Sequence, residues 1–199
     1  MNGNFPSTTI GWMAIATGTA VVLAVVTITL FYTVNSIFGS INDAINGVAA
    51  ILSAILAWML YVQHHAKSPI LGQVTLGLAV IGAAIMVVGS ILILFNFTGW
   101  VLAGLYTGVG SALIGIWLIG FNYSMLNDGI LPNNLVKFGL VTGAFMVFGL
   151  FALPGIFAGI DSLESVPWYL IAVLPSGLGI YITYPIWCIW LGRVMLRTQ

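Results

Sequence analysis

The chain has 199 residues, of which 61% are hydrophobic and 4% are charged, and its formal net charge is zero. Because a soluble domain carries about 25% charged residues, this composition excludes an ordinary water-soluble domain and predicts a surface that mostly faces lipid. A neutral chain offers no basic surface for nucleic acid, and a single cysteine, Cys188, excludes a disulfide within the chain.

Six segments are apolar enough and long enough to cross a bilayer, which takes about 20 residues in a helix. They are residues 9–33, 44–62, 70–95, 99–121, 135–160 and 167–191. The first is expected to be retained, because MNGNFPSTT before it has no lysine or arginine, unlike a cleavable signal peptide. All six are too long and too uniformly apolar for barrel strands. We therefore predict an all-α fold: a single polytopic transmembrane helical bundle of six spans over residues 1–199.

The charges in the connections predict how the bundle is oriented. All lysines and arginines fall on one side of a six-span arrangement, and they are Lys67, Lys137, Arg193 and Arg197. On that side the sole acid is Asp128, and the other acids fall opposite: Asp43, Asp161 and Glu164. By the positive-inside rule both termini are expected in the cytoplasm.

The spans are expected to form three tandem hairpins that enter and leave on the basic side. The third and fifth spans contain similar segments, GLAVIGAAIMVVGSIL and GLVTGAFMVFGLFAL. Such likeness indicates either a duplication of the second and third hairpins, as in some transporters, or the common composition of apolar helices.

Tryptophans near the predicted span ends are typical of interfacial belts. On the basic side these are Trp12, Trp58, Trp117, Trp187 and Trp190. On the other side they are Trp100 and Trp168.

The stretch YVQHHAKSPI holds both histidines, His64 and His65, at the end of the second span. Adjacent helical residues point about 100° apart, so the pair cannot easily hold one metal ion, and no further ligand cluster completes a zinc site. We interpret the pair as a polar cap at the interface, with no cofactor. The alternative is that one histidine is the axial ligand of a haem or a chlorophyll-type pigment.

No span carries an ionisable residue near its middle, where such a group is by default functional. Serine, histidine and acid are not grouped as in hydrolases, so the sequence predicts no catalytic chemistry. Polar residues expected at the mouth opposite the basic side are either solvated loop residues or weak ligands of a hard cation. They are Asn35, Asn42, Asp43, Asn46, Asn96, Asp161 and Glu164.

Small residues at four-residue spacing predict close helix packing, because helices in lipid associate through close backbone approach. The rows are Gly104 with Gly108 and Ala112, Gly139 with Gly143, Gly155 with Gly159, and Ala16 with Ala20 and Ala24. The partner helices belong either to this chain or to another.

The sixth span contains Pro175 and Pro185, with Gly177 and Gly179 between them. Each interior proline removes one helix hydrogen bond and favours a kink. A helix broken in this way either supplies the curvature needed for packing or forms a solute site, as in transporters.

The segments YPIWCIWLGR, FTGWVLAGLYT and LPGIFAGIDS resemble those of an uncharacterised family of six-span bacterial integral membrane proteins, a domain of unknown function. The resemblance implies a six-helix fold in the bacterial inner membrane. It implies no functional residues.

Three functions are therefore considered. The favoured one is an accessory or scaffold subunit of a larger respiratory or photosynthetic membrane complex, whose partners are the lipid bilayer and other transmembrane helices, of the complex or of a homo-oligomer. The alternative is a passive carrier or channel for a neutral or apolar small solute. A membrane enzyme or pigment protein is the third.

Overall fold

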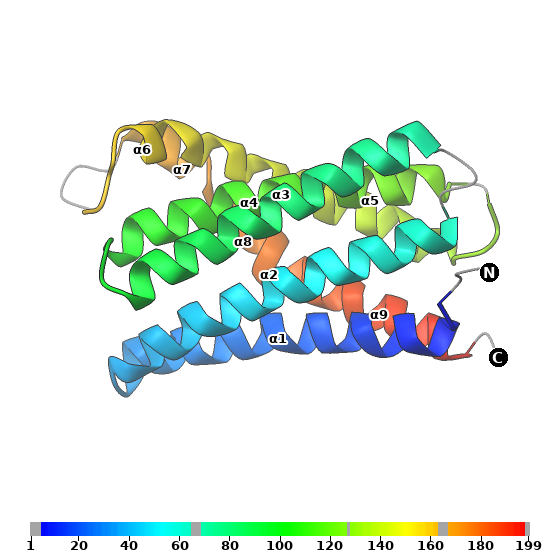
Figure 1. The fold of residues 1–199 in the computed structure, drawn as a ribbon, viewed down its shortest axis with the longest axis horizontal. Helices are drawn as coiled ribbons and strands as arrows, with labels where there is room; N and C mark the ends of the chain where they lie inside the picture. The colour runs from blue at the N-terminus through cyan, green and yellow to red at the C-terminus, as the bar shows by residue number, and fades with distance from the viewer. Residues whose placement is uncertain (1–4, 65–68, 127, 163–166, 198–199) are drawn as a thin grey trace.

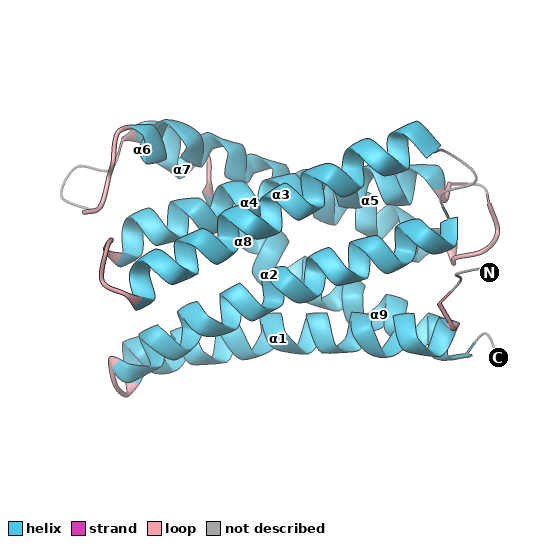
Figure 2. Cartoon of the chain, viewed as in Figure 1, coloured by secondary structure: helices cyan, strands magenta, loops and turns pink. Residues whose placement is uncertain are grey.

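The computed structural model describes residues 5–64, 69–126, 128–162 and 167–197, so the predictions for His65, Lys67 and Glu164 lie outside the described residues. Over the described residues every regular element is helical, and loops and turns connect the helices (Figure 2). Four spans are continuous helices: α1 (Ser7–Thr33), α2 (Ile37–His64), α3 (Pro69–Leu94) and α4 (Trp100–Ser124). The fifth comprises α5 (Asn133–Val147), the 3-10 segment η1 (Phe148–Ala152) and α6 (Leu153–Phe157). The sixth comprises α7 (Trp168–Ile171), α8 (Leu174–Leu178), the π-helical segment η2 (Gly179–Thr183) and α9 (Tyr184–Arg197).

The predicted six-span bundle is confirmed, because six helical segments are long and apolar enough to cross a membrane. The chain is a multi-pass membrane protein. The start of α1 and the end of α9 lie at the same end of the bundle (Figure 1). We call this the basic end, because Lys137, Arg193 and Arg197 belong to it, and we call the end with Asp43 and Asp161 the acidic end.

Successive spans pack side by side, and the last returns to the first. The sequential pairs α1–α2, α2–α3, α3–α4 and α4–α5 are all in contact, and α9 packs along α1 (Figure 1). The sixth span changes neighbours along its length: α7 and α8 contact η1, and α8 also contacts α4 and α5. The sixth span therefore lies beside α1 at the basic end and turns toward η1 and α4 at the acidic end.

The second span begins earlier than the sequence predicted. Helix α2 starts at Ile37 rather than at residue 44, so Asp43 lies in its second turn and not in a loop. Asn35 helps to start this helix, because its side-chain oxygen accepts a hydrogen bond from the Ile37 N–H at 2.9 Å. The polar stretch that looked like a connection is therefore part of a span.

Pairs of glycines bring neighbouring spans into close contact. Gly82 of α3 lies against Gly110 of α4, and a Cβ on either glycine would overlap the carbonyl oxygen of the other. Two further pairs are Gly115 with Gly143, which joins α4 to α5, and Gly11 with Gly192, which joins α1 to α9. Such close backbone approach supplies the packing that the hydrophobic effect cannot supply between helices in lipid.

The predicted packing residues fall into two groups. Gly108 and Ala112 lie near Gly149 of η1, Gly139 lies against Asn122, Gly143 lies against Gly115, and Gly155 lies against Leu105. The other two are placed differently. Gly104 has open space where a side chain would be, and Gly159 ends the helical turn of α6 with φ 63° and no neighbour. In α1 the face toward α9 contains Gly11, Ala14 and Gly18, whereas Ala16 is exposed.

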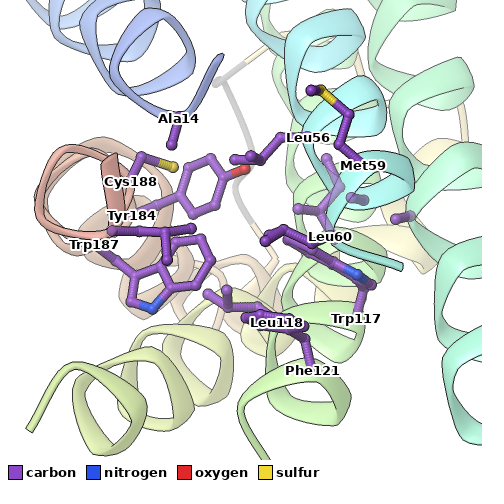
Figure 3. Packing of buried hydrophobic residues seen from close by; sticks show 14 of the residues in the cluster. Ala14, Leu56, Met59, Leu60, Trp117, Leu118, Phe121, Tyr184, Trp187 and Cys188 are labelled. Atoms are coloured by element: carbon purple, nitrogen blue, oxygen red, sulfur yellow. The ribbon is translucent and has the colours of Figure 1, made fainter. Parts of the chain in front are cut away.

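The main hydrophobic core occupies the half of the bundle nearest the basic end. Four rings form its centre, and we call them the aromatic cluster: Trp117, Phe121, Tyr184 and Trp187 (Figure 3). Trp187 stacks on Tyr184 with ring centroids 6.3 Å apart and meets Trp117 and Phe121 edge-on at 6.2 Å.

The exposure of the tryptophans is compatible with the predicted belts at four positions and contradicts them at two. Trp12, Trp58, Trp100 and Trp168 are exposed to the surroundings of the bundle, as an interfacial belt requires. Trp117 is 2% exposed and Trp187 is 0% exposed, so both belong to the core. They are inside because they meet each other between α4 and α9.

Candidate functional site

The acidic half of the bundle contains a crevice of two adjoining lobes. We call the first the polar lobe; it measures about 450 Å³ and lies between the end of α1, the start of α2, the end of α3 and the start of α4. The second, which we call the apolar lobe, measures about 460 Å³ and lies between α4 and the interrupted sixth span. The lobes meet at four residues that line both, Trp100, Gly104, Thr107 and Tyr181.

The change of neighbours in the sixth span explains why the crevice is there. At the basic end α9 fills the space beside α1, but at the acidic end α7 and α8 lean toward η1 and α4. The end of α1 and the start of α2 therefore lie apart from α7, as Figure 1 shows. The bundle is packed in one half and open in the other.

The wall of the polar lobe contains two buried asparagines of α2, Asn42 and Asn46, which are 5% and 7% exposed. The Asn42 amide donates to the Ala24 carbonyl of α1 at 2.6 Å, and the Asn46 amide donates to the Asn42 side-chain oxygen at 3.0 Å. An unpaired buried amide costs about 1–3 kcal/mol, so these bonds hold the polar wall against α1. The Asn46 side chain also lies within hydrogen-bonding reach of the Tyr181 hydroxyl.

Asp43 supplies the charge of the crevice. It is half-buried, it lines the polar lobe, and it lies close enough to Tyr181 for a direct electrostatic interaction. Within the described ranges no lysine or arginine pairs with it, because Lys137, Arg193 and Arg197 belong to the opposite end. The carboxylate is therefore available to a ligand.

The apolar lobe is lined mainly by hydrocarbon, from Leu105 of α4 and from Leu170, Val173, Leu174 and Ile180 of the sixth span. Gly104 and Gly177 also line it, and neither has an atom within 4 Å of the place where a Cβ would stand. The missing side chains at these two glycines leave the lobe wide.

The predicted kink residues lie along this lobe. Pro175 belongs to the first turn of α8, just after the break between α7 and α8. Gly179 begins the π-helical segment η2 and lies against Met146, while Pro185 is buried in α9. Because Pro185 has no N–H, it cannot donate to the carbonyl of Tyr181 four residues earlier, and the wide turn of η2 precedes it.

A buried hydrogen bond closes the crevice toward the core. The Tyr184 hydroxyl of α9 lies 3.0 Å from the Ser53 hydroxyl of α2, and Ser53 donates to the Ala49 carbonyl at 2.7 Å. Ser53 lies about two helical turns below Asn46, so this contact marks the floor between the polar lobe and the aromatic cluster.

The expected cluster of acids for a hard cation is not assembled by the described residues. Asp161 lies at the start of α4 and accepts hydrogen bonds from the N–H groups of Gly99 at 2.6 Å and Leu102 at 3.3 Å, so it caps that helix. Asn35 caps α2, and Asn42, Asp43, Asn46 and Asn96 line the polar lobe. In the described ranges no three residues among His, Cys, Asp and Glu come together as metal ligands would.

His64 lies at the basic end, away from the crevice. Its ring meets the Phe121 ring at 5.9 Å, edge-on. The space beside it measures about 30 Å³, which is too small for a haem or a pigment ring. The interpretation of His64 as a polar cap and the alternative of an axial ligand stay predictions.

Sequence reasoning missed that Trp100 and Gly104 line a crevice, and it did not single out Leu174, which lines the apolar lobe. It also missed the 3-10 segment η1, although Pro154, which cannot donate to the Leu150 carbonyl, was a signal for it. The hydroxyls of Thr107 and Tyr181 could be found as polar groups in apolar spans.

Comparison of the chain with known protein families, with curated proteins and with solved structures finds no match. The resemblance of YPIWCIWLGR and its companion segments to six-span bacterial membrane proteins stays a prediction. Function is therefore inferred from the chain's own residues and geometry.

Proposed function

We propose that the protein is a passive membrane carrier that takes a small, at least partly apolar solute into the crevice at the acidic end. The observation that supports this is the asymmetry of the bundle: a two-lobed crevice in one half and a sealed aromatic core in the other. Ligand sites are typically concave spaces of about 300–1,000 Å³ with apolar walls and a few polar groups, and each lobe falls within that range.

The sixth span supports the same proposal. Its break at Ala172 and Val173 and its π-helical segment lie along the apolar lobe, and interrupted spans form the solute sites of many carriers. Segments with weakened backbone hydrogen bonding rearrange more easily than regular helix. The span that lines the solute site is thus the span best suited to move.

We place the protein in the bacterial inner membrane with both termini in the cytoplasm. The charge distribution supports this orientation, because the described cations belong to the end where α1 starts and α9 stops. Reporter fusions at the two ends should both be active on the cytoplasmic side. A periplasmic signal from either end would overturn the orientation.

The carrier is tested with purified protein in lipid vesicles and a panel of solutes from glycerol to short alcohols and indole. At least one solute should cross faster than in protein-free vesicles. Gly104→Phe should slow that solute, because the ring enters the crevice without meeting a neighbour. Ala16→Phe is the matched control, since it adds the same ring to the lipid-facing side of α1. Equal rates with and without protein across the panel would refute the proposal.

An accessory role in a respiratory or photosynthetic complex is the second proposal, and one face of α3 favours it. Residues spaced alternately by four and three are all exposed along this helix: Ile70, Val74, Gly77, Ile81, Ala84, Val88 and Ile91. Apolar residues at this spacing form the contact line between paired helices. Gentle detergent extraction should then recover a stable partner that Gly77→Leu with Ala84→Leu releases. Recovery of a lone monomer from the native membrane would refute it.

A further inference from the structure

We infer that the crevice binds a cationic amphiphile, whose ammonium group lies in the polar lobe beside Asp43 and whose hydrocarbon tail lies in the apolar lobe. This inference rests on the crevice of the proposed function. It concerns which molecules bind there, and it does not require that they cross the membrane.

The crevice contains a negative charge and therefore favours a cationic ligand. Among the described side chains that line the two lobes Asp43 is the one acid, and no described lysine or arginine lines either lobe. The second described acid of this end, Asp161, adds negative charge nearby, although the N–H groups at the start of α4 already hold it. An anionic ligand would meet repulsion without a counter-charge, whereas an ammonium group would supply the missing partner of Asp43.

The walls of the polar lobe suit an organic ammonium rather than a bare metal ion. Phe31, Tyr32, Trp100 and Tyr181 contribute ring faces or edges, and aromatic faces attract alkylated ammonium groups. A hard cation such as calcium takes six to eight oxygen ligands at short distances. The lobe offers one carboxylate, and the Asn42 side-chain oxygen already accepts from Asn46, so the lobe of about 450 Å³ suits a bulky ammonium better than a compact oxygen shell.

The apolar lobe accounts for the tail. It continues from the polar lobe at Gly104 and Thr107 and is walled by leucine, valine and isoleucine side chains of α4 and the sixth span. Burial of a hydrocarbon chain contributes about 0.8 kcal/mol per methylene group when it leaves water, so the tail adds affinity that the single charge pair cannot supply. A molecule with one charged head and one apolar tail matches both lobes at once.

The test measures binding of decyltrimethylammonium to the protein in nanodiscs of phosphatidylcholine by equilibrium dialysis, with empty nanodiscs subtracted. Decanol, which has the same tail and no charge, is measured alongside. The wild type should bind the ammonium more tightly than the alcohol. Asp43→Asn should weaken ammonium binding roughly tenfold, equivalent to about 1.4 kcal/mol, and leave alcohol binding unchanged. Asp43→Glu, which keeps the charge, should retain most of the ammonium affinity.

Two results would overturn the inference: equal ammonium binding by wild type and Asp43→Asn, or tighter binding of the alcohol by the wild type. A second variant tests the site without touching the charge. Gly104→Phe should reduce binding of both molecules, and Ala16→Phe should reduce neither; full binding by Gly104→Phe would place the ligand elsewhere and overturn the inference. Failure of the carrier is distinguishable, because it would show as absent solute flux in vesicles while Asp43-dependent binding persists.

Discussion

The contact between α4 and α5 at Gly143 allows a stability effect to be worked out from geometry. A Cβ at Gly143 would lie 2.6 Å from the Gly115 carbonyl oxygen and 3.2 Å from the Ile119 nitrogen. Ordinary van der Waals contact begins at 3.4 Å, so Gly143→Ala must move the two backbones apart by about 0.8 Å. Because the obstructing atoms belong to a helix backbone, they cannot turn aside as a flexible side chain would.

Overpacking of this kind costs about 1–3 kcal/mol, and the higher helix propensity of alanine offsets up to about 1 kcal/mol. We therefore expect Gly143→Ala to lower the free energy of unfolding by about 1–2 kcal/mol, which corresponds to about 2–8 °C in Tm for a chain of this size. The measurement is thermal unfolding of the purified protein in one detergent, followed by intrinsic fluorescence.

Gly104→Ala is the control, because nothing lies within 4 Å of its new methyl group and the Tm should stay level or rise. The reciprocal variant Gly115→Ala should also be destabilised, since its Cβ would lie 2.9 Å from the Gly143 carbonyl oxygen. The double variant should lose less than the sum of the two, because both substitutions separate the same helices. A Tm for Gly143→Ala equal to that of Gly104→Ala would refute the close crossing.

Two further predictions concern single hydrogen-bonded side chains. Asp161→Ala removes the carboxylate that accepts from the Gly99 N–H, and loss of such a helix cap should cost about 0.5–2 kcal/mol in unfolding free energy, read as a lower Tm. An unchanged Tm would mean that water caps the helix equally well. Tyr184→Phe removes the hydroxyl that meets Ser53 and should cost about 0.6 kcal/mol, the mean for such bonds in membrane proteins. Tyr123→Phe, at an exposed ring, should change nothing, and equal effects of the two would contradict the buried bond.

The spans could be predicted from the sequence because length and uniform hydrophobicity are properties of each segment alone. The start of helix α2 could not be predicted in this way. Its first turns contain Asn42 and Asp43, which read as a connection, and the Asn42 amide stabilises them as helix by donating to the Ala24 carbonyl of α1. The start of α2 is therefore decided by a contact with α1 and not by the composition of the segment itself.

The candidate site was predictable only in part for the same reason. The polarity of Asp43 and its neighbours and the prolines of the sixth span were visible as separate signals. Their meeting in one crevice depends on α8 turning toward η1 while α9 stays beside α1. Trp117 and Trp187 were predicted at the interface but are buried. Interfacial and buried tryptophans look alike in the sequence and differ only in which residues of other spans face them.

The aromatic cluster bears on whether the protein leaks ions across the membrane. The Trp187 ring lies about 6 Å, centroid to centroid, from the rings of Tyr184, Trp117 and Phe121, in the core between the crevice and the basic end. Because these rings are packed together, the bundle would not conduct protons across the membrane even when water fills the crevice. A carrier of the proposed kind would need no separate domain to close it against ions.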